Sequence, residues 1–75
     1  MSGLNAAFGR TLRELREQLG LSQEKLAQRA KISRNFVGSV ERGESSLSLD
    51  VAERMSRALG QPLSRVIQDA ERRSK

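Results

Sequence analysis

Apolar residues recur along this chain at intervals of three or four positions, and this spacing limits the possible folds more than any other feature of the sequence. In the first segment the repeat falls at Phe8, Leu12, Leu15 and Leu19. The interval matches the 3.6 residues of an α-helical turn, and strand-like alternation never lasts long. An all-α fold is therefore expected. Because 75 residues provide interior for only one core, one domain over residues 1–75 is expected.

Capping and helix-breaking residues divide the chain into five predicted helices. Ser22, Ser33 and Ser48 stand where N-caps are expected, and Gly20 stands where the first helix should end. Pro62 can occupy the first turn of the last helix, where its missing N–H costs nothing. The predicted helices run over about residues 5–19, 23–30, 34–42, 49–59 and 63–72.

The net charge of +5 is concentrated in the first half of the chain. Residues 1–42 carry eight Lys and Arg against four Asp and Glu, a net charge of +4, whereas residues 43–75 carry a net charge of +1. A basic half favours a polyanionic partner, because neutralising phosphates releases condensed counterions. The alternative is an ordinary surface, which also carries charges of both signs.

Several chemistries lack the residues that they usually need. The sequence contains no cysteine and no histidine, so the usual zinc ligands, the thiol nucleophile and the common general base are missing. There is also no glycine-rich phosphate loop and no paired-carboxylate motif. We expect no catalytic residue, no metal and no cofactor, so an enzyme is the least favoured class. The apolar runs are far shorter than a membrane span or a signal-peptide core, which predicts a cytoplasmic protein.

The most informative feature is the pair of short predicted helices at 23–30 and 34–42, joined by a tight connection. In a helix-turn-helix the second helix lies in the major groove and presents its N-terminal residues to base edges. That geometry needs an apolar inward face, which Phe36, Val37 and Val40 provide. It also needs hydrogen-bonding groups on the outward side, and the candidates are Arg34, Asn35 and Ser39.

Two stretches carry a resemblance to a known family: LSQEKLA at residues 21–27 and SRNFVGSVERG at residues 33–43. With the following helix and the closing Ala-Leu-Gly, they resemble the XRE family, whose best-known members are the phage repressors and Cro proteins. The resemblance covers residues 8–68, and the second stretch is most similar to the controller proteins of restriction–modification systems. It implies a five-helix, lambda-repressor-like DNA-binding domain with the helix-turn-helix at the second and third helices.

The resemblance implies that three residues read DNA bases. Arg34 and Asn35 match positions that enter the major groove, and Ser39 lies on the same helix face. Arginine can bond guanine O6 and N7, and asparagine can bond adenine N6 and N7. The ordinary alternative is that these side chains merely solvate an exposed helix end, although a cation there opposes the helix dipole.

The resemblance also implies phosphate contacts and one structural ion pair. Ser22, Gln23 and Arg42 match phosphate-binding positions, and Gln23 also braces the third helix. Arg16 and Glu41 match an ion pair that ties the first helix to the third. The alternatives are that Gln23 is simply a good helix former and that Arg42 only interacts with the helix dipole.

The chain departs from the controller-protein pattern at three positions. Those proteins often have tyrosine where this chain has Phe36, and they commonly have Arg and Asn where it has Ser45 and Ser46. The chain therefore lacks side-chain groups that the controller proteins would use for some contacts with the DNA backbone. Arg42, Lys25 or the helix dipoles would have to replace them.

The predicted helix over 63–72 has more apolar surface than so small a core needs. We therefore expect Leu63, Val66 or Ile67 to take part in a homodimer interface. A dimer doubles the length of the DNA site and places its half-sites about one turn, roughly 34 Å, apart. This spacing suits a pseudo-palindromic operator.

Two classes of function remain open. The first is a homodimeric transcription regulator, nucleoid-associated when bound to DNA, that controls its own promoter and restriction–modification genes. In the phage repressors, acidic residues on the second helix touch RNA polymerase, so the matching position of Glu24 implies a polymerase contact. The second class is an antitoxin-type or other XRE repressor that binds a protein partner as well as DNA, although this chain leaves few residues for a toxin-binding segment.

Overall fold

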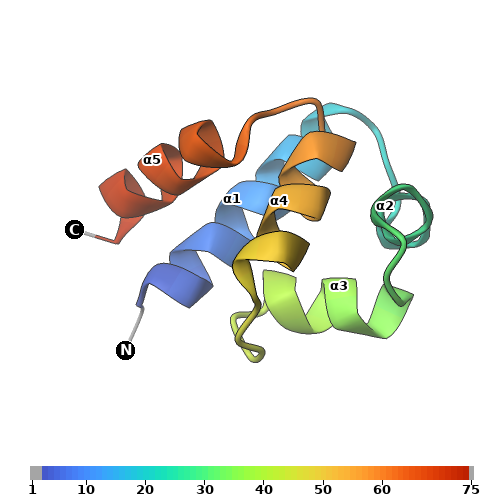
Figure 1. Cartoon of the computed structure of the whole chain (residues 1–75), viewed down its shortest axis with the longest axis horizontal. Helices are drawn as coiled ribbons and strands as arrows, with labels where there is room; N and C mark the ends of the chain where they lie inside the picture. The colour runs from blue at the N-terminus through green and yellow to red at the C-terminus, as the bar shows by residue number, and fades with distance from the viewer. Residues whose placement is uncertain (1–2, 75) are drawn as a thin grey trace.

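The computed structural model describes residues 3–74, and five α-helices account for most of this range. They are α1 (Leu4–Gln18), α2 (Gln23–Ala30), α3 (Arg34–Glu41), α4 (Leu49–Ala58) and α5 (Leu63–Arg73) (Figure 1). No strand occurs within the described range, so the predicted all-α fold is confirmed. Every predicted helix is present, and none of its ends differs from the prediction by more than one residue. None of these helices is both long and apolar enough to cross a lipid bilayer.

Serine hydroxyls begin three of the helices, as predicted. Ser22, Ser33 and Ser48 each accept a hydrogen bond from the backbone N–H three residues further on, at 3.0, 3.0 and 3.1 Å. The prediction for Pro62 was wrong, because it lies just before α5 as its N-cap, with ψ at 148°. Its carbonyl still accepts the N–H of Arg65 at 3.1 Å. An N-cap combines an extended backbone with an accepting carbonyl, and the φ angle of proline suits both.

The end of α1 corrects one prediction about the core. The helical repeat places Leu19 with Phe8 and Leu12 on the buried face, but Leu19 is 54% exposed. Leu19 is the C-cap residue of α1, and Gly20 follows it with a left-handed backbone, φ 70°. The chain therefore turns away before Leu19 reaches a packing partner. Leu15, one turn earlier, is half-buried against the core.

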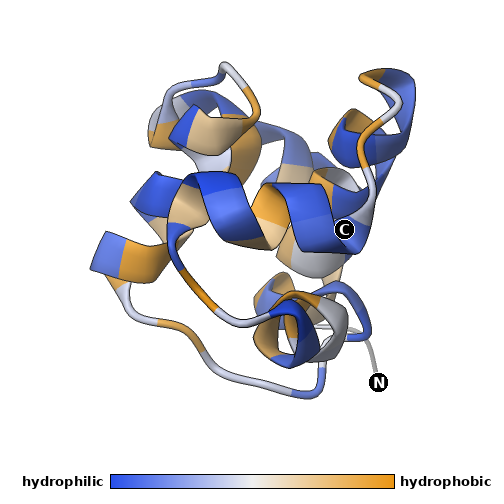
Figure 2. Ribbon diagram, turned by 90° about the vertical axis from the view of Figure 1, so that its right-hand side faces the viewer, coloured by the Kyte–Doolittle hydropathy of each residue, from blue (hydrophilic) through white to orange (hydrophobic). Residues whose placement is uncertain are grey.

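The first helix organises the packing of the others. It lies between α3 and α5, while α2 packs against α3 and α4, and α4 also contacts α5 (Figure 1). Hydrophilic and hydrophobic residues alternate along each helix in Figure 2, as expected of amphipathic helices that turn their apolar sides inward. The fully enclosed side chains of the core include Leu12, Leu26, Val37, Val40, Met55 and Val66.

The backbones of α1 and α3 touch at Gly9. A Cβ atom built on Gly9 would lie 2.0 Å from the carbonyl oxygen of Val40, far inside van der Waals contact. Any larger residue at this position would force the two helices apart. Glycine here therefore fixes how closely α3 sits against the body of the domain.

Candidate nucleic-acid interface

The third helix exposes its polar N-terminal end while its opposite side closes the core. Arg34 and Asn35 are exposed, and Ser39 is half-buried one turn beyond Asn35. Val37 and Val40 on the inner side are 0% and 1% exposed. All three residues predicted to read bases are thus accessible, at least in part. Their contact with DNA stays a prediction.

Phe36 occupies the edge of the inner face of α3 rather than its centre. It is half-buried and packs against the core. The buried arc of α3 extends instead through Val37, Gly38, Val40 and Glu41. Phe36 immediately precedes this arc, so its ring lies at the boundary between the core and the exposed surface.

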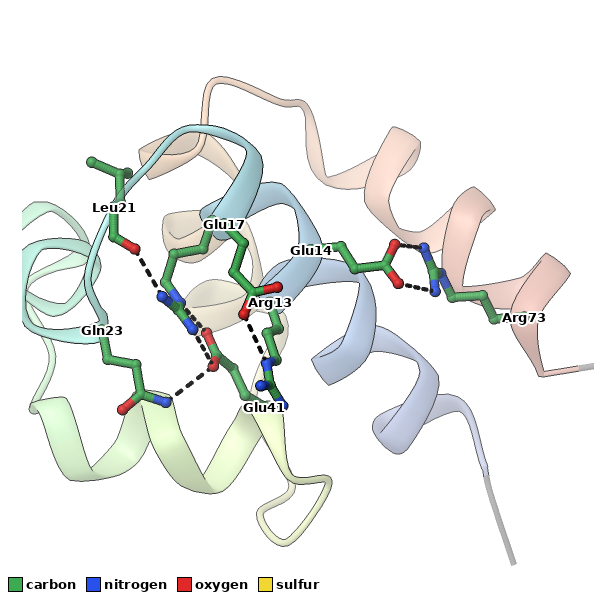
Figure 3. Close-up of polar contacts among 8 residues, drawn as sticks. Arg13, Glu14, Glu17, Leu21, Gln23, Glu41 and Arg73 are labelled. Atoms are coloured by element: carbon green, nitrogen blue, oxygen red, sulfur yellow. Dashed lines mark hydrogen bonds and ion pairs between the residues drawn. The ribbon is translucent and has the colours of Figure 1, made fainter.

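A buried carboxylate holds α3 against two other parts of the molecule (Figure 3). Glu41 accepts two bonds from Arg16, from Nε to Oε2 at 2.7 Å and from Nη2 to Oε1 at 3.0 Å. The Nε2 of Gln23 donates to the same Oε1 at 3.0 Å. Arg16 also donates from Nη1 to the carbonyl of Leu21 at 2.8 Å. The predicted ion pair and the predicted brace by Gln23 are therefore both present.

The burial of this ion pair indicates that its role is to stabilise the fold. The side chains of Arg16 and Glu41 are only 11% and 3% exposed. The hydrogen bond with Glu41 raises the pKa of Arg16 above its usual value, against the opposing effect of desolvation. Removing either partner would leave the other charge buried and uncompensated. The pair therefore fixes the C-terminal end of α3 relative to α1.

The two polar residues at the start of α2 keep donors free for a further partner. The Oγ of Ser22 accepts the N–H of Lys25, so its own hydroxyl hydrogen can point elsewhere. Gln23 gives one bond through Nε2 to Glu41, and an amide group has a second N–H. Both side chains stand where the positive end of the α2 dipole attracts anions. Their phosphate contacts stay predictions.

Arg42 lies at the C-cap of α3 and has a partner that the sequence did not suggest. Its Nε is 3.1 Å from Oε1 of Glu44, and the two side chains are 58% and 59% exposed. Such an exposed pair is weak and can exchange its carboxylate for a phosphate. Ser45 and Ser46 follow in the loop before α4.

The prediction that Val66 lines a dimer interface was wrong. Val66 is 0% exposed, because α5 packs against α1 and α4 and turns Val66 and Ala70 into the core. It cannot touch another subunit while the domain stays folded. Leu63 and Ile67 are half-buried and keep some accessible surface.

Two exposed leucines that the sequence did not indicate lie near Ile67. Leu4 is 48% exposed and Leu49 is 75% exposed. Together with Leu47 and Ile67 they surround a hollow of about 110 Å³ whose lining also includes Phe8. We call Leu4, Leu47, Leu49 and Ile67 the apolar patch. The available signal was a leucine at the first position of α1 and of α4, where one side of the helix has no neighbour.

The described residues contain no group of three or more His, Cys, Asp and Glu side chains that could hold a metal ion.

Comparison with known proteins places this arrangement in a family. A family model described as helix-turn-helix matches residues 12–66. Control protein C.MunI from Mycoplasma sp is 36% identical over 73 residues, which cover 96% of this chain and 99% of that protein. Control protein C.BamHI from Bacillus amyloliquefaciens is 37% identical over 60 residues, which cover 79% of this chain and 74% of that protein.

Solved structures agree with the sequence relatives. The restriction-modification controller protein C.AhdI from Aeromonas hydrophila superposes with a TM-score of 0.79 at 41% identity, covering 81% of this chain and 92% of that one. The clp gene regulator ClgR from C. glutamicum superposes with a TM-score of 0.92 at 25% identity, covering 100% and 97%. This chain therefore belongs to the XRE family of helix-turn-helix proteins and is a DNA-binding transcription regulator, not an enzyme, related to restriction–modification controller proteins.

Proposed function

We propose that this protein binds a specific operator in double-stranded DNA as a homodimer and controls its own promoter together with restriction–modification genes. The observation that carries the proposal is the accessible polar N-terminal end of α3, a helix whose C-terminal end is held by the buried network around Glu41. The control-protein relatives support the choice of target genes. On this proposal the protein acts in the cytoplasm and is associated with the nucleoid when bound to DNA.

Recognition on this proposal begins with α3 in the major groove. Arg34 bonds the O6 and N7 of a guanine, and Asn35 bonds an adenine. Ser39, whose side chain reaches less far, contacts a base further along the groove. Ser22 and Gln23 donate to a phosphate at the N-terminus of α2. These phosphate contacts fix the register in which the base-reading side chains meet the bases.

Arg42 contributes sequence-independent affinity. Its exposed ion pair with Glu44 opens when a phosphate takes the place of the carboxylate. Phosphate contacts of this kind add to the salt dependence of binding, because each one releases condensed counterions.

The apolar patch, together with the partly exposed Leu63, is the dimer interface in this proposal. The patch lies where α1 and α4 begin, whereas the N-terminal end of α3 lies on the opposite side of the domain (Figure 1). Two copies joined at the patch would carry two α3 helices, as an operator with two half-sites requires.

Binding-site selection on random duplexes tests the proposed recognition. Arg34→Ala should relax the preference at one base pair by about 1–3 kcal/mol. Arg42→Ala should weaken binding to all duplexes alike and reduce the salt slope by about 1. The matched control is Arg13→Ala, which removes the same charge from an α1 side chain paired with Glu17 and should change neither property. A wild-type protein that retains no sequence preferentially would contradict the proposal.

We also propose that Glu24 contacts RNA polymerase. It is exposed in the first turn of α2, next to Gln23. In transcription reconstituted with purified polymerase, Glu24→Gln should lower activation and leave operator affinity unchanged, whereas Glu17→Gln on α1 should alter neither. Unchanged activation by Glu24→Gln would rule the contact out.

A further inference from the structure

The turn between α2 and α3 contains an unusual backbone conformation. Lys31 has φ 59° and ψ 48°, and it is the one residue other than glycine with a positive φ in the range 3–74. The other left-handed positions in this range are Gly20, Gly43 and Gly60. A side chain makes this conformation less favourable than it is for glycine. Contacts from elsewhere in the molecule must therefore help to hold the turn.

Arg54 reaches this turn from α4. Its Nε donates to the carbonyl oxygen of Ala30 at 3.1 Å, and its Nη2 donates to that of Lys31 at 2.6 Å. Carbonyl groups at the end of a helix have no partner within the helix. Its third nitrogen, Nη1, lies 3.4 Å from the carboxylate of Asp50, one turn earlier on α4. One planar guanidinium thus fixes two consecutive carbonyls of the turn and is itself oriented by a carboxylate.

We call the bonds from Arg54 to these two carbonyls the Arg54 clamp. Its position matters because the turn sets the orientation of α3. Only Ile32 and Ser33 separate Lys31 from the first residue of α3. The N–H of Ile32 is bonded to the carbonyl of Ala27 at 3.0 Å, and Ser33 caps α3. A change of backbone angle at Lys31 would therefore rotate α3 about its N-terminal end.

We propose that Arg54 is a positioning residue for DNA recognition. By holding the carbonyls of Ala30 and Lys31, it sets the angle at which α3 presents Arg34 and Asn35 to the bases. This inference rests on the proposed recognition through α3. The buried pair of Arg16 and Glu41 fixes the C-terminal end of the helix, and Arg54 fixes the N-terminal end.

Arg57 provides a matched control on the same helix. It lies about one turn beyond Arg54, carries the same charge, and has its ion pair with Glu53 on its own helix, at 3.5 Å. If Arg54 acts only through its charge, alanine at either position should have the same effect. If Arg54 positions α3, only its own substitution should affect discrimination between sequences.

The test compares a duplex recovered by binding-site selection with a random duplex of the same length. Arg54→Ala should weaken binding to the selected duplex by about tenfold, the factor expected when one base contact is misplaced. Its effect on the random duplex should be no larger than that of Arg57→Ala. Arg54→Lys, which offers one compact donor group in place of a fork, should fall between the wild type and alanine. Equal losses for Arg54→Ala and Arg57→Ala on both duplexes would overturn the inference.

Lys31→Gly separates positioning from stability. Glycine removes the cost of the left-handed turn, so Arg54→Ala combined with Lys31→Gly should regain the thermal stability that Arg54→Ala loses. We expect affinity for the selected duplex to remain about tenfold low in this double variant, relative to Lys31→Gly alone. If affinity returned with stability, Arg54 would act only on folding and the inference would be wrong.

Amide hydrogen exchange without DNA makes the clamp testable independently of the proposed function. Arg54→Ala should accelerate exchange at the N–H of Ile32, while Arg57→Ala should not. Unchanged exchange at Ile32 would overturn the inference about Arg54. A wild-type protein that does not discriminate between the two duplexes would instead contradict the proposed function.

Discussion

The contact that seats α3 and the surface where α1 and α4 begin are built in opposite ways. At α3, the buried carboxylate of Glu41 is bonded to Arg16 and Gln23. On the surface where α1 and α4 begin, Leu4 and Leu49 are 48% and 75% exposed beside a hollow. The first region satisfies its buried polar group internally, and the second leaves apolar groups uncovered.

On the proposed function, the two regions serve different tasks. A recognition helix must keep one orientation, and hydrogen bonds with defined geometry provide that orientation. A surface that associates with another needs only to remove apolar area from water, which is not directional. Substitutions in the contact that seats α3 should therefore damage the fold, and substitutions in the apolar patch should change association without damaging it.

The largest expected effect belongs to the close contact of α1 with α3. Gly9→Ala places a Cβ atom 2.0 Å from the carbonyl oxygen of Val40, so the helices must separate. We expect a loss of about 3 kcal/mol or more in the free energy of unfolding, measured by urea denaturation. Gly3→Ala is the control, because a Cβ there meets nothing within 4 Å. A Gly9→Ala protein as stable as the wild type would show that α3 is not rigidly seated.

Glu41→Ala tests the network that anchors the same helix. The substitution leaves Arg16, 11% exposed, without its carboxylate, and we expect a loss of about 2–4 kcal/mol in the free energy of unfolding. The control is Glu17→Ala, which breaks the exposed pair with Arg13 and should cost less than about 1 kcal/mol. Equal losses for the two variants would mean that burial adds nothing to the Arg16–Glu41 pair.

Leu49→Asp tests the uncovered apolar patch. Because Leu49 is 75% exposed, the folded monomer should lose little stability, but a carboxylate in the apolar patch should raise the dissociation constant of the dimer by about tenfold or more. Analytical ultracentrifugation measures that constant directly. Leu19→Asp is the matched control, because Leu19 is 54% exposed at the end of α1 and outside the patch. A monomeric wild type, or equal effects of the two substitutions, would contradict the proposed interface.

The sequence alone predicted what depends on local interactions. Helical periodicity and the caps at Ser22, Ser33 and Ser48 are properties of neighbouring residues, so the five helices were placed to within one residue at each end. The family resemblance added the pair of Arg16 and Glu41, whose partners are 25 residues apart. Periodicity alone contains no information about such a distance.

Predictions from the sequence were wrong where burial depends on how the helices pack together. Periodicity identifies an apolar face but not which part of it a neighbouring helix covers. The sequence therefore predicts Val66 in an interface although it lies in the core, and it predicts Leu19 to be buried although the chain turns away. The bonds from Arg54 to the turn before α3 depend in the same way on tertiary packing.

The smallest expected effect concerns an ion pair that contrasts with the one at α3. Arg73 of α5 bonds Glu14 of α1 (Figure 3), and unlike Glu41 the Glu14 side chain is half exposed. The hydrogen bond from Arg73 lowers the pKa of Glu14 below its usual value of 4.5. A carboxyl whose pKa is lowered by folding stabilises the folded state above its unfolded pKa, and this stabilisation disappears as the pH falls through the folded pKa.

Glu14→Gln should therefore lower the melting temperature slightly at pH 7, and the difference from the wild type should vanish as the pH is lowered below the folded pKa of Glu14. Arg73→Ala should have a similar effect at pH 7, and the double variant should lose no more than either single variant, because both remove the same interaction. High salt should weaken the effect of this exposed pair and leave that of Glu41→Ala nearly unchanged. A difference between Glu14→Gln and the wild type that persisted unchanged into acid would mean that Glu14 contributes through packing rather than through its charge.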